Sequence, residues 1–334
     1  WVFRREAKGV QLTTNPADGY TVAASTRADF APDVTVSSTV FGAQDRLTVT
    51  PLMPNTTYFL RAGALYGGST VYAATVITTA TLSQLVTGTT VYNIHLTSMV
   101  VNWVPLAMAP PDASSNSAQG YVLQASSMST FLPLWQTSFT PNVALSTLTI
   151  DSLRGGVTYY FRVGSLNWNG VPHFAGAVST LMPVQLGVEL TTHTISVPGL
   201  VNLNSTVLIT TSVVVTNTGN VKETYWVRAT TVSAGSPWSI GATPWVDRYV
   251  LSMLINAGEP LSGDFGAEDR LADPEQACNA TVFAFGGDCV QVPVGGTRTL
   301  WFKLDTPIVT STNMSQDIRI YVRAARDPDP DPNP

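Results

Sequence analysis

The stretch Thr57–Arg61 (TYFLR) returns as Thr158–Arg162 (TYYFR), at an offset of 101 residues (158 minus 57). The same offset aligns Gly19–Thr26 (GYTVAAST) with Gly120–Ser127 (GYVLQASS). A repeat that keeps one register across separate blocks indicates two copies of one structural unit. A period of about 100 residues is too long for a solenoid repeat and suits one immunoglobulin-like β-sandwich per unit.

Hydrophobic and polar side chains alternate along these blocks with a period of two, which is typical of half-buried β-strands. In the second unit, Tyr159, Phe161 and Val163 are expected to face one side of a sheet. Turn sequences follow at Tyr66–Ser69 (YGGS) and Asn167–Gly170 (NWNG) and predict hairpins. The composition, 44% hydrophobic and 12% charged, excludes a disordered chain and a coiled coil. The sequence therefore predicts an all-β protein.

The segment Leu52–Tyr58 (LMPNTTY) has the form Leu-x-Pro-x-Thr-x-Tyr. It resembles the tyrosine corner of fibronectin type III domains, in which the tyrosine hydroxyl bonds back to the chain upstream. The second unit keeps the leucine and the tyrosine but has Gly155 for the proline and Val157 for the threonine. The resemblance implies sandwiches whose structural core includes Leu52, Tyr58, Leu153 and Tyr159, with Trp103 as the tryptophan of an early strand.

The first unit starts one strand short. The offset places the counterpart of Trp103 at Val2 (103 minus 101), so the first strand of the second unit, within Val86–Asn93, has no counterpart. Two explanations stay open: the chain is trimmed or truncated, or a strand from a neighbouring subunit fills the open edge.

The repeat ends at Pro183, and a third sandwich is expected after it. Its strands are predicted at Val188–Ile195, Thr206–Thr216, Thr224–Thr231, Thr297–Leu304 and Asp317–Ala324. The segment Thr211–Asn220 (TSVVVTNTGN) resembles the Val-x-Asn-x-Gly hairpin of immunoglobulin-like modules related to cell adhesion in bacterial and archaeal surface proteins. Gly219 and Asn220 tolerate the positive φ that such a turn needs.

A long insertion is expected inside the third sandwich. Within it, Trp238, Trp245 and Tyr249–Ile255 predict a small satellite core or a helical turn rather than a sugar platform. Cys278 and Cys289 are eleven residues apart (289 minus 278), which favours a local disulfide and an oxidising compartment over two reduced thiols. The acidic residues of the region predict either a Ca²⁺ site or a solvated loop. The candidate ligands for calcium are Asp264, Glu268, Asp269 and Asp288.

The predicted fold class is therefore all-β, with three tandem immunoglobulin-like β-sandwiches. The predicted domains are a fibronectin type III-like sandwich at 1–83 without its first strand, a second one at 84–183, and an immunoglobulin-like sandwich at 184–326 with a disulfide-closed insertion at 235–289. The alternating Asp-Pro sequence at 327–334 predicts an extended linker or tail.

The sequence contains no motif typical of an enzyme or of a nucleic-acid-binding protein. His95, His173 and His193 are isolated, and no Gly-x-Ser-x-Gly elbow occurs, so an enzyme is not expected. A net charge of −5 with scattered cations predicts no nucleic-acid partner. No apolar run is long enough for a membrane-spanning segment. Trp168 at a hairpin tip predicts an exposed contact residue, unless its ring folds back onto the sheet.

These observations predict an extracellular or cell-surface, noncatalytic structural protein. It would be a subunit of a bacterial surface fibre, filament or sheath, or an adhesin, acting through sandwich stacking and self-association. Its expected partners are copies of itself or a cell-surface or polysaccharide ligand, and calcium is the single cofactor considered. The alternative is a noncatalytic accessory or carbohydrate-binding portion of a larger secreted enzyme.

Overall fold

The computed structural model describes residues 2–4, 17–106, 117–197 and 199–326. The predicted linker at 327–334 lies outside them. The described residues form β-strands and a single 3₁₀ turn, Ser262–Asp264, so the all-β prediction is confirmed. The chain divides into two compact units, Trp1–Leu153 with Thr158–Leu181, and Arg154–Val157 with Met182–Pro334. The first unit holds both repeats.

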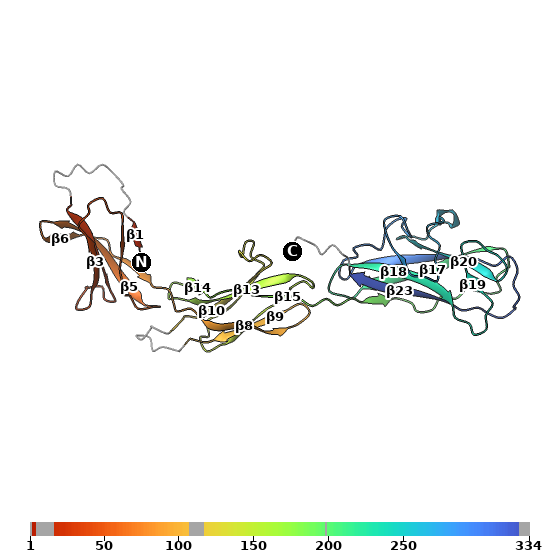
Figure 1. Cartoon of the computed structure of the whole chain (residues 1–334), viewed down its shortest axis with the longest axis horizontal. Helices are drawn as coiled ribbons and strands as arrows, with labels where there is room; N and C mark the ends of the chain where they lie inside the picture. The colour runs from red at the N-terminus through yellow and green to blue at the C-terminus, as the bar shows by residue number, and fades with distance from the viewer. Residues whose placement is uncertain (1, 5–16, 107–116, 198, 327–334) are drawn as a thin grey trace. The chain divides into compact units, whose positions relative to one another are not determined.

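The second repeat folds as a sandwich of two antiparallel sheets. One sheet has the order β12 (Thr147–Ile150), β9 (Met99–Val104), β8 (Thr87–Ile94). The facing sheet has the order β11 (Gln136–Thr140), β10 (Tyr121–Ser126), β13 (Thr158–Leu166), β14 (Pro172–Phe174), and β15 (Val178–Leu181) also pairs with β13. Figure 1 shows β8 and β9 in one layer and β13 to β15 in the other. This is the fibronectin type III-like sandwich that the motif implies.

The first repeat has the same strand order with one strand fewer among the described residues. Its larger sheet runs β3 (Thr35–Thr39), β2 (Gly19–Ser25), β5 (Thr57–Tyr66), β6 (Ser69–Tyr72), with β7 (Ile77–Ala80) also paired to β5. The facing sheet consists of β1 (Val2–Arg4) and β4 (Arg46–Thr48). Within the described residues no strand takes the place that β8 has in the second repeat, and both explanations for this stay predictions.

The sequence repeat extends to side-chain geometry. The guanidinium of Arg61 lies 4.0 Å from the ring centroid of Phe30, and that of Arg162 lies 4.2 Å from the ring centroid of Phe131. A second ring packs on each guanidinium, Tyr72 at 3.9 Å in the first repeat and Phe174 at 4.0 Å in the second. Each repeat therefore holds one arginine between two aromatic rings on its larger sheet, where cation–π attraction stabilises the stack.

The residues predicted for the structural core lie inside the two sandwiches. Tyr58, Trp103, Leu153 and Tyr159 are buried, and Leu52 is half-buried against the core of the first sandwich. The backbone N–H of Met53 donates a hydrogen bond of 3.0 Å to the Tyr58 hydroxyl. This bond across five residues is the tyrosine corner that the Leu-x-Pro-x-Thr-x-Tyr pattern implies.

The third sandwich forms the second unit together with Arg154–Val157. One sheet has the order β16 (Val188–Leu190), β17 (Thr206–Asn217), β22 (Thr297–Asp305), β20 (Arg248–Ile255), β19 (Ser239–Ile240). The facing sheet has the order β21 (Gln276–Ala277), β18 (Glu223–Thr231), β23 (Ile318–Arg326). The five predicted strands correspond to β16, β17, β18, β22 and β23, with β16 shorter than expected.

The interpretation of Tyr249–Ile255 as a satellite core or helical turn inside an insertion is wrong. These residues belong to β20, which pairs with β22 in the main sheet. Tyr249, Leu251 and Met253 are buried in the main core of the sandwich. Every residue of β20 after Arg248 is buried, so the strand shows no polar alternation. A strand covered on both faces cannot be distinguished from a buried helix by periodicity alone.

The Val-x-Asn-x-Gly hairpin depends on its asparagine. The expected positive φ at Gly219 and Asn220 is wrong, since neither residue adopts it. The side chain of Asn217 is buried, and its Nδ2 donates to the carbonyl oxygens of Val221 and Val292, at 2.9 Å each. Its Oδ1 accepts the backbone N–H of Gly219 at 2.8 Å. One amide side chain thus satisfies backbone groups on both sides of the turn, which only asparagine can do from this position.

Candidate functional site

The two repeats of the first unit are joined through a buried asparagine in the turn between β13 and β14. Nδ2 of Asn167 donates to the carbonyl oxygens of Ala80 and Thr81, at 3.2 and 3.1 Å. Its Oδ1 accepts the backbone N–H groups of Asn169 and Val171, at 3.0 and 2.9 Å. Asn167 therefore both shapes its own turn and holds the end of the first sandwich.

A second buried asparagine fixes the same turn from the other side. Nδ2 of Asn55 donates to the Ser117 hydroxyl at 2.9 Å, and its Oδ1 accepts the backbone N–H of Trp168 at 3.2 Å. The Ser83 hydroxyl donates to the carbonyl oxygen of Ser165 at 2.9 Å. We call this set of contacts between the two repeats the junction. Its polar side chains are buried and hydrogen-bonded, so the contact leaves none of them unsatisfied.

Trp168 lies at the tip of the turn that the junction holds. Its side chain is 51% exposed, so the ring does not fold back onto the sheet. Within the described part of the chain its indole N–H makes no hydrogen bond. Trp168 is one of the residues that line a groove of about 500 Å³ on the second sandwich.

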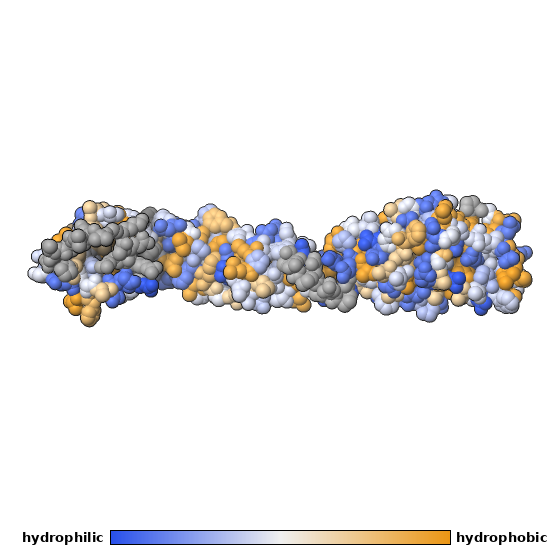
Figure 2. All heavy atoms as spheres, turned by 90° about the horizontal axis from the view of Figure 1, so that it is seen from above, coloured by the Kyte–Doolittle hydropathy of each residue, from blue (hydrophilic) through white to orange (hydrophobic). Residues whose placement is uncertain are grey.

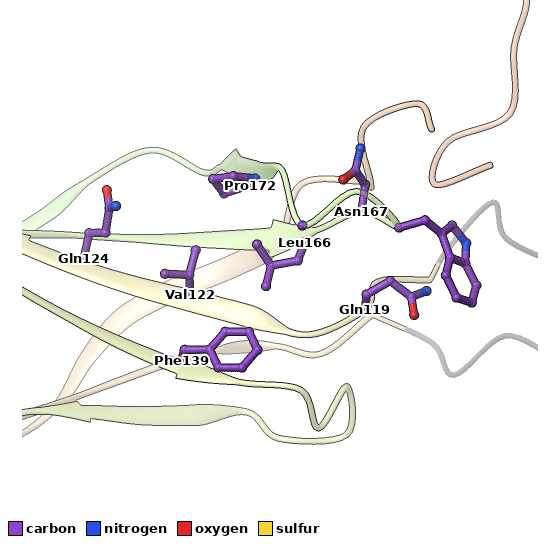
Figure 3. A pocket seen from close by; sticks show the side chains of 9 residues that line it. Gln119, Val122, Gln124, Phe139, Leu166, Asn167 and Pro172 are labelled. Atoms are coloured by element: carbon purple, nitrogen blue, oxygen red, sulfur yellow. The ribbon is translucent and has the colours of Figure 1, made fainter. Parts of the chain in front are cut away.

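The groove has an apolar middle and amide groups at its ends. Among the lining residues Val122 and Leu166 are buried, and Phe139, which is 58% exposed, is the second aromatic residue beside Trp168. Figure 3 shows these three side chains between Gln124 at one end and Gln119 at the other. None of the residues that line the groove is ionisable.

The second sandwich also has very few charges. Residues 84–183 contain four charged residues, which are Asp112, Asp151, Arg154 and Arg162. The overlapping segment from 62 to 150 contains only the first of these. The chain as a whole is 12% charged, so about a dozen would be expected in 100 residues. The composition of the whole chain conceals this distribution, which a local count of charged residues in the sequence reveals.

Large apolar side chains take the place of charges on this sandwich. Figure 2 shows orange patches across the middle of the view, where the second repeat lies. Four exposed apolar residues follow the edge strand β8, its turn and β9, and we call them the β8–β9 face: Tyr92 (62% exposed), Ile94 (47%), Leu96 (43%) and Val104 (57%). Edge strands without charged residues or proline, and exposed apolar surface, are features of surfaces that become covered by another chain.

The candidate calcium ligands lie in the second unit and mostly contact nearby backbone. The Asp264 carboxylate accepts the N–H of Leu261 at 2.7 Å, and that of Asp269 accepts the N–H of Gly266 at 2.7 Å. Asp288 lies 3.9 Å from the Arg298 guanidinium, and Glu268 lies beside Gly266. Among the described residues no three His, Cys, Asp or Glu side chains gather as a metal site. Calcium binding stays a prediction.

The predicted disulfide is present. Cys278 and Cys289 are bonded, with their Cα atoms 5.6 Å apart, and both are buried in the main core of the third sandwich. The ring of Phe283, which lies between them in sequence, is buried in the same core. The disulfide thus closes residues 278–289 over the core, not the whole region predicted as an insertion.

The three histidines lie apart. Nδ1 of His173 is 2.7 Å from the carbonyl oxygen of Ser83, while His95 and His193 are exposed. In the described ranges, no histidine hydrogen-bonds a hydroxyl, thiol or carboxylate side chain, which is the contact that nucleophilic catalysis needs. None of the described helical segments has the length and hydrophobicity to span a membrane.

The second unit contains a buried carboxylate whose charge opposes folding. Glu223 is fully buried; its Oε1 accepts the N–H of Gly187 at 2.7 Å, while its Oε2 has no partner in the described structure. Burial raises the pKa of Glu223 above 4.5. The folded state therefore holds this proton more tightly than the unfolded chain. Its contribution to stability is present below pH 4.5 and is lost as the pH rises through the folded pKa.

We expect Glu223→Gln to reduce this pH dependence. The amide keeps an acceptor for Gly187 and carries no charge, so the second unit should lose less stability between about pH 4.5 and 7 than the wild type. Urea unfolding at several pH values measures this. Glu189→Gln, at an exposed position of strand β16, is the control for replacing a glutamate by a glutamine. Equal profiles for the wild type and Glu223→Gln would contradict the expectation.

Comparisons with known proteins add little to this description. No protein-family model and no curated protein matches the chain. The FN1–FN3 domains of chicken CNTN1 share 16% identity over 51% of this chain and 56% of that one, with a TM-score of 0.27. A solved chain described as a myokine structure shares 14% identity over 30% of this chain and 98% of its own length, with a TM-score of 0.24. The chain spans little more than half of the CNTN1 structure. The fibronectin type III-like fold therefore rests on the strand order and the tyrosine corner.

Proposed function

We propose that the protein is an extracellular, noncatalytic structural protein that associates with copies of itself. It would serve as a subunit of a bacterial surface fibre, filament or sheath, or as an adhesin. The observation that carries this proposal is the near absence of charge on the second sandwich, combined with the exposed apolar residues of the β8–β9 face.

Charges on edge strands keep soluble β-proteins apart, because pairing two chains would then bury unpaired ions. The strand β8 is an edge of its sheet and has the sequence TGTTVYNI, without Lys, Arg, Asp, Glu or Pro. A second copy that covers it would satisfy open backbone groups and remove apolar area from water. Nothing electrostatic opposes this contact.

Three further features support the proposal. The disulfide fits an oxidising, extracellular setting. The junction connects the two repeats of the first unit through buried hydrogen bonds, which suits a structural subunit. The Val-x-Asn-x-Gly hairpin resembles adhesion-related modules of bacterial and archaeal surface proteins.

Assembly of the purified chain tests the proposal. Sedimentation velocity and electron microscopy should show ordered association that grows with protein concentration. Because few charges take part, the association should persist or strengthen in high salt. The double variant Tyr92→Lys with Val104→Lys should raise the concentration needed for assembly about tenfold or more, since it places like charges on the β8–β9 face.

The matched control places two lysines at exposed apolar positions of the second unit, Leu261→Lys with Met314→Lys. It adds the same charge and should assemble like the wild type. A wild-type chain that stays monomeric at every concentration, or equal loss of assembly in both double variants, would overturn the proposal for the β8–β9 face.

A further inference from the structure

We propose that the groove on the second sandwich binds a neutral polysaccharide. This inference goes beyond self-association and uses other residues, since none of the groove residues belongs to the β8–β9 face. It rests on the aromatic walls, the amide groups and the absence of charge that the groove combines.

The first observation is that hydrogen bonds fix the turn that contains Trp168. Its ring is half-exposed, yet its backbone N–H is bonded to Asn55 and its turn is shaped by Asn167. An exposed aromatic ring on a fixed turn binds without the cost of ordering a loop. Pyranose rings present apolar C–H faces that pack against such flat rings, and Phe139 offers a second one in the same groove.

The second observation concerns the supply of hydrogen bonds for hydroxyl groups. Oε1 of Gln124 accepts from Nε and Nη2 of Arg162, at 2.9 and 2.7 Å, which fixes the amide and leaves its NH₂ as a donor. The side-chain amide of Gln119 makes no hydrogen bond within the described residues. Amides donate and accept at one site and therefore suit sugar hydroxyls, which do the same.

The third observation concerns the charge of the ligand, which the lining of the groove indicates to be neutral. No residue of the groove lining is ionisable, and the nearby Arg162 is already bonded to Gln124 and stacked between Phe131 and Phe174. An anionic glycan would need free cations that this groove lacks. Its volume of about 500 Å³ falls within the range of small-ligand sites, roughly 300–1,000 Å³. The fitting ligand is an uncharged chain of hexose or pentose units.

Affinity electrophoresis with soluble laminarin, mannan, xylan and dextran tests the proposal, with dextran sulfate as the anionic comparison. At least one neutral polysaccharide should retard the protein. Trp168→Ala should weaken this binding about tenfold or more, as truncation of an aromatic residue that the ligand covers does. Trp168→Phe should retain part of it, and thermal unfolding confirms that both variants fold. Trp245→Ala removes an indole that is 59% exposed in the second unit and should leave binding unchanged.

Binding to none of the four neutral polysaccharides, or equal binding by the wild type and Trp168→Ala, would overturn the inference. Retardation by dextran sulfate alone would overturn the assignment to neutral chains. The Tyr92→Lys, Val104→Lys variant separates this test from self-association, because it should bind polysaccharide without assembling. Loss of binding in Trp168→Ala with normal assembly supports the groove, while failure of assembly alone affects only the proposed function.

Discussion

Asn167→Asp is expected to destabilise the first unit by about 3 kcal/mol. The carboxylate cannot donate to the carbonyl oxygens of Ala80 and Thr81, which Nδ2 of Asn167 holds at 3.2 and 3.1 Å. Both oxygens would lose their partner and face a buried negative charge. The effect is large because the site is 2% exposed, so water cannot replace the lost bonds.

Amide hydrogen exchange and chemical unfolding measure this effect, and the amides of β13 and β14 should exchange faster in the variant. Asn169→Asp is the matched control. Asn169 is exposed and uses only its Oδ1, which accepts the N–H of Ala80 at 2.9 Å, and aspartate keeps that acceptor. Similar stability of Asn167→Asp and Asn169→Asp would show that the junction does not depend on the Asn167 amide.

Removing the disulfide is expected to destabilise the second unit by about 3 kcal/mol, the loop-closure value for a bridge between residues eleven apart. The double variant Cys278→Ala with Cys289→Ala removes the loop closure and so raises the conformational entropy of the unfolded chain. In the folded state it also removes two buried sulfur atoms from the core around Phe283. Both effects lower the free energy of unfolding.

Guanidinium unfolding of the wild type and the double variant checks this result. Hydrogen exchange should show the loss in the second unit and leave β10 and β13 of the first unit unchanged. Val282→Ala changes a half-buried side chain inside the loop without opening it and serves as the control for local packing. A double variant as stable as Val282→Ala would contradict a stabilising role for the bridge.

The junction bears on both proposals for this protein. The side chains of Asn55, Ser83 and Asn167 are buried and hydrogen-bonded between the two repeats of the first unit. Asn55 also accepts the backbone N–H of Trp168, which lines the groove. The contact between the repeats and the placement of Trp168 therefore depend on the same few hydrogen bonds.

Local patterns in the sequence were enough for most strands. Alternation and turn residues predict β13 and its hairpin at Asn167–Gly170, and the Leu52–Tyr58 pattern implies the bond from Met53 to Tyr58. The period of two is imposed by a sheet with one buried face, so it is visible without any tertiary information. β20 could not be predicted in this way, because both its faces are buried and its sequence therefore shows no alternation of apolar and polar residues.

The all-β class, the repeat, the tyrosine corner and the disulfide follow from the amino-acid sequence, because each depends on residues that are near one another or that recur at one offset. The roles of Asn55 and Asn167 become visible in the folded chain, since these two residues are 112 positions apart (167 minus 55) and resemble ordinary turn residues in the sequence. The groove likewise collects residues from 119 to 172. Such sites depend on which strands lie side by side, and long-range pairing is set by the packing of the whole sandwich.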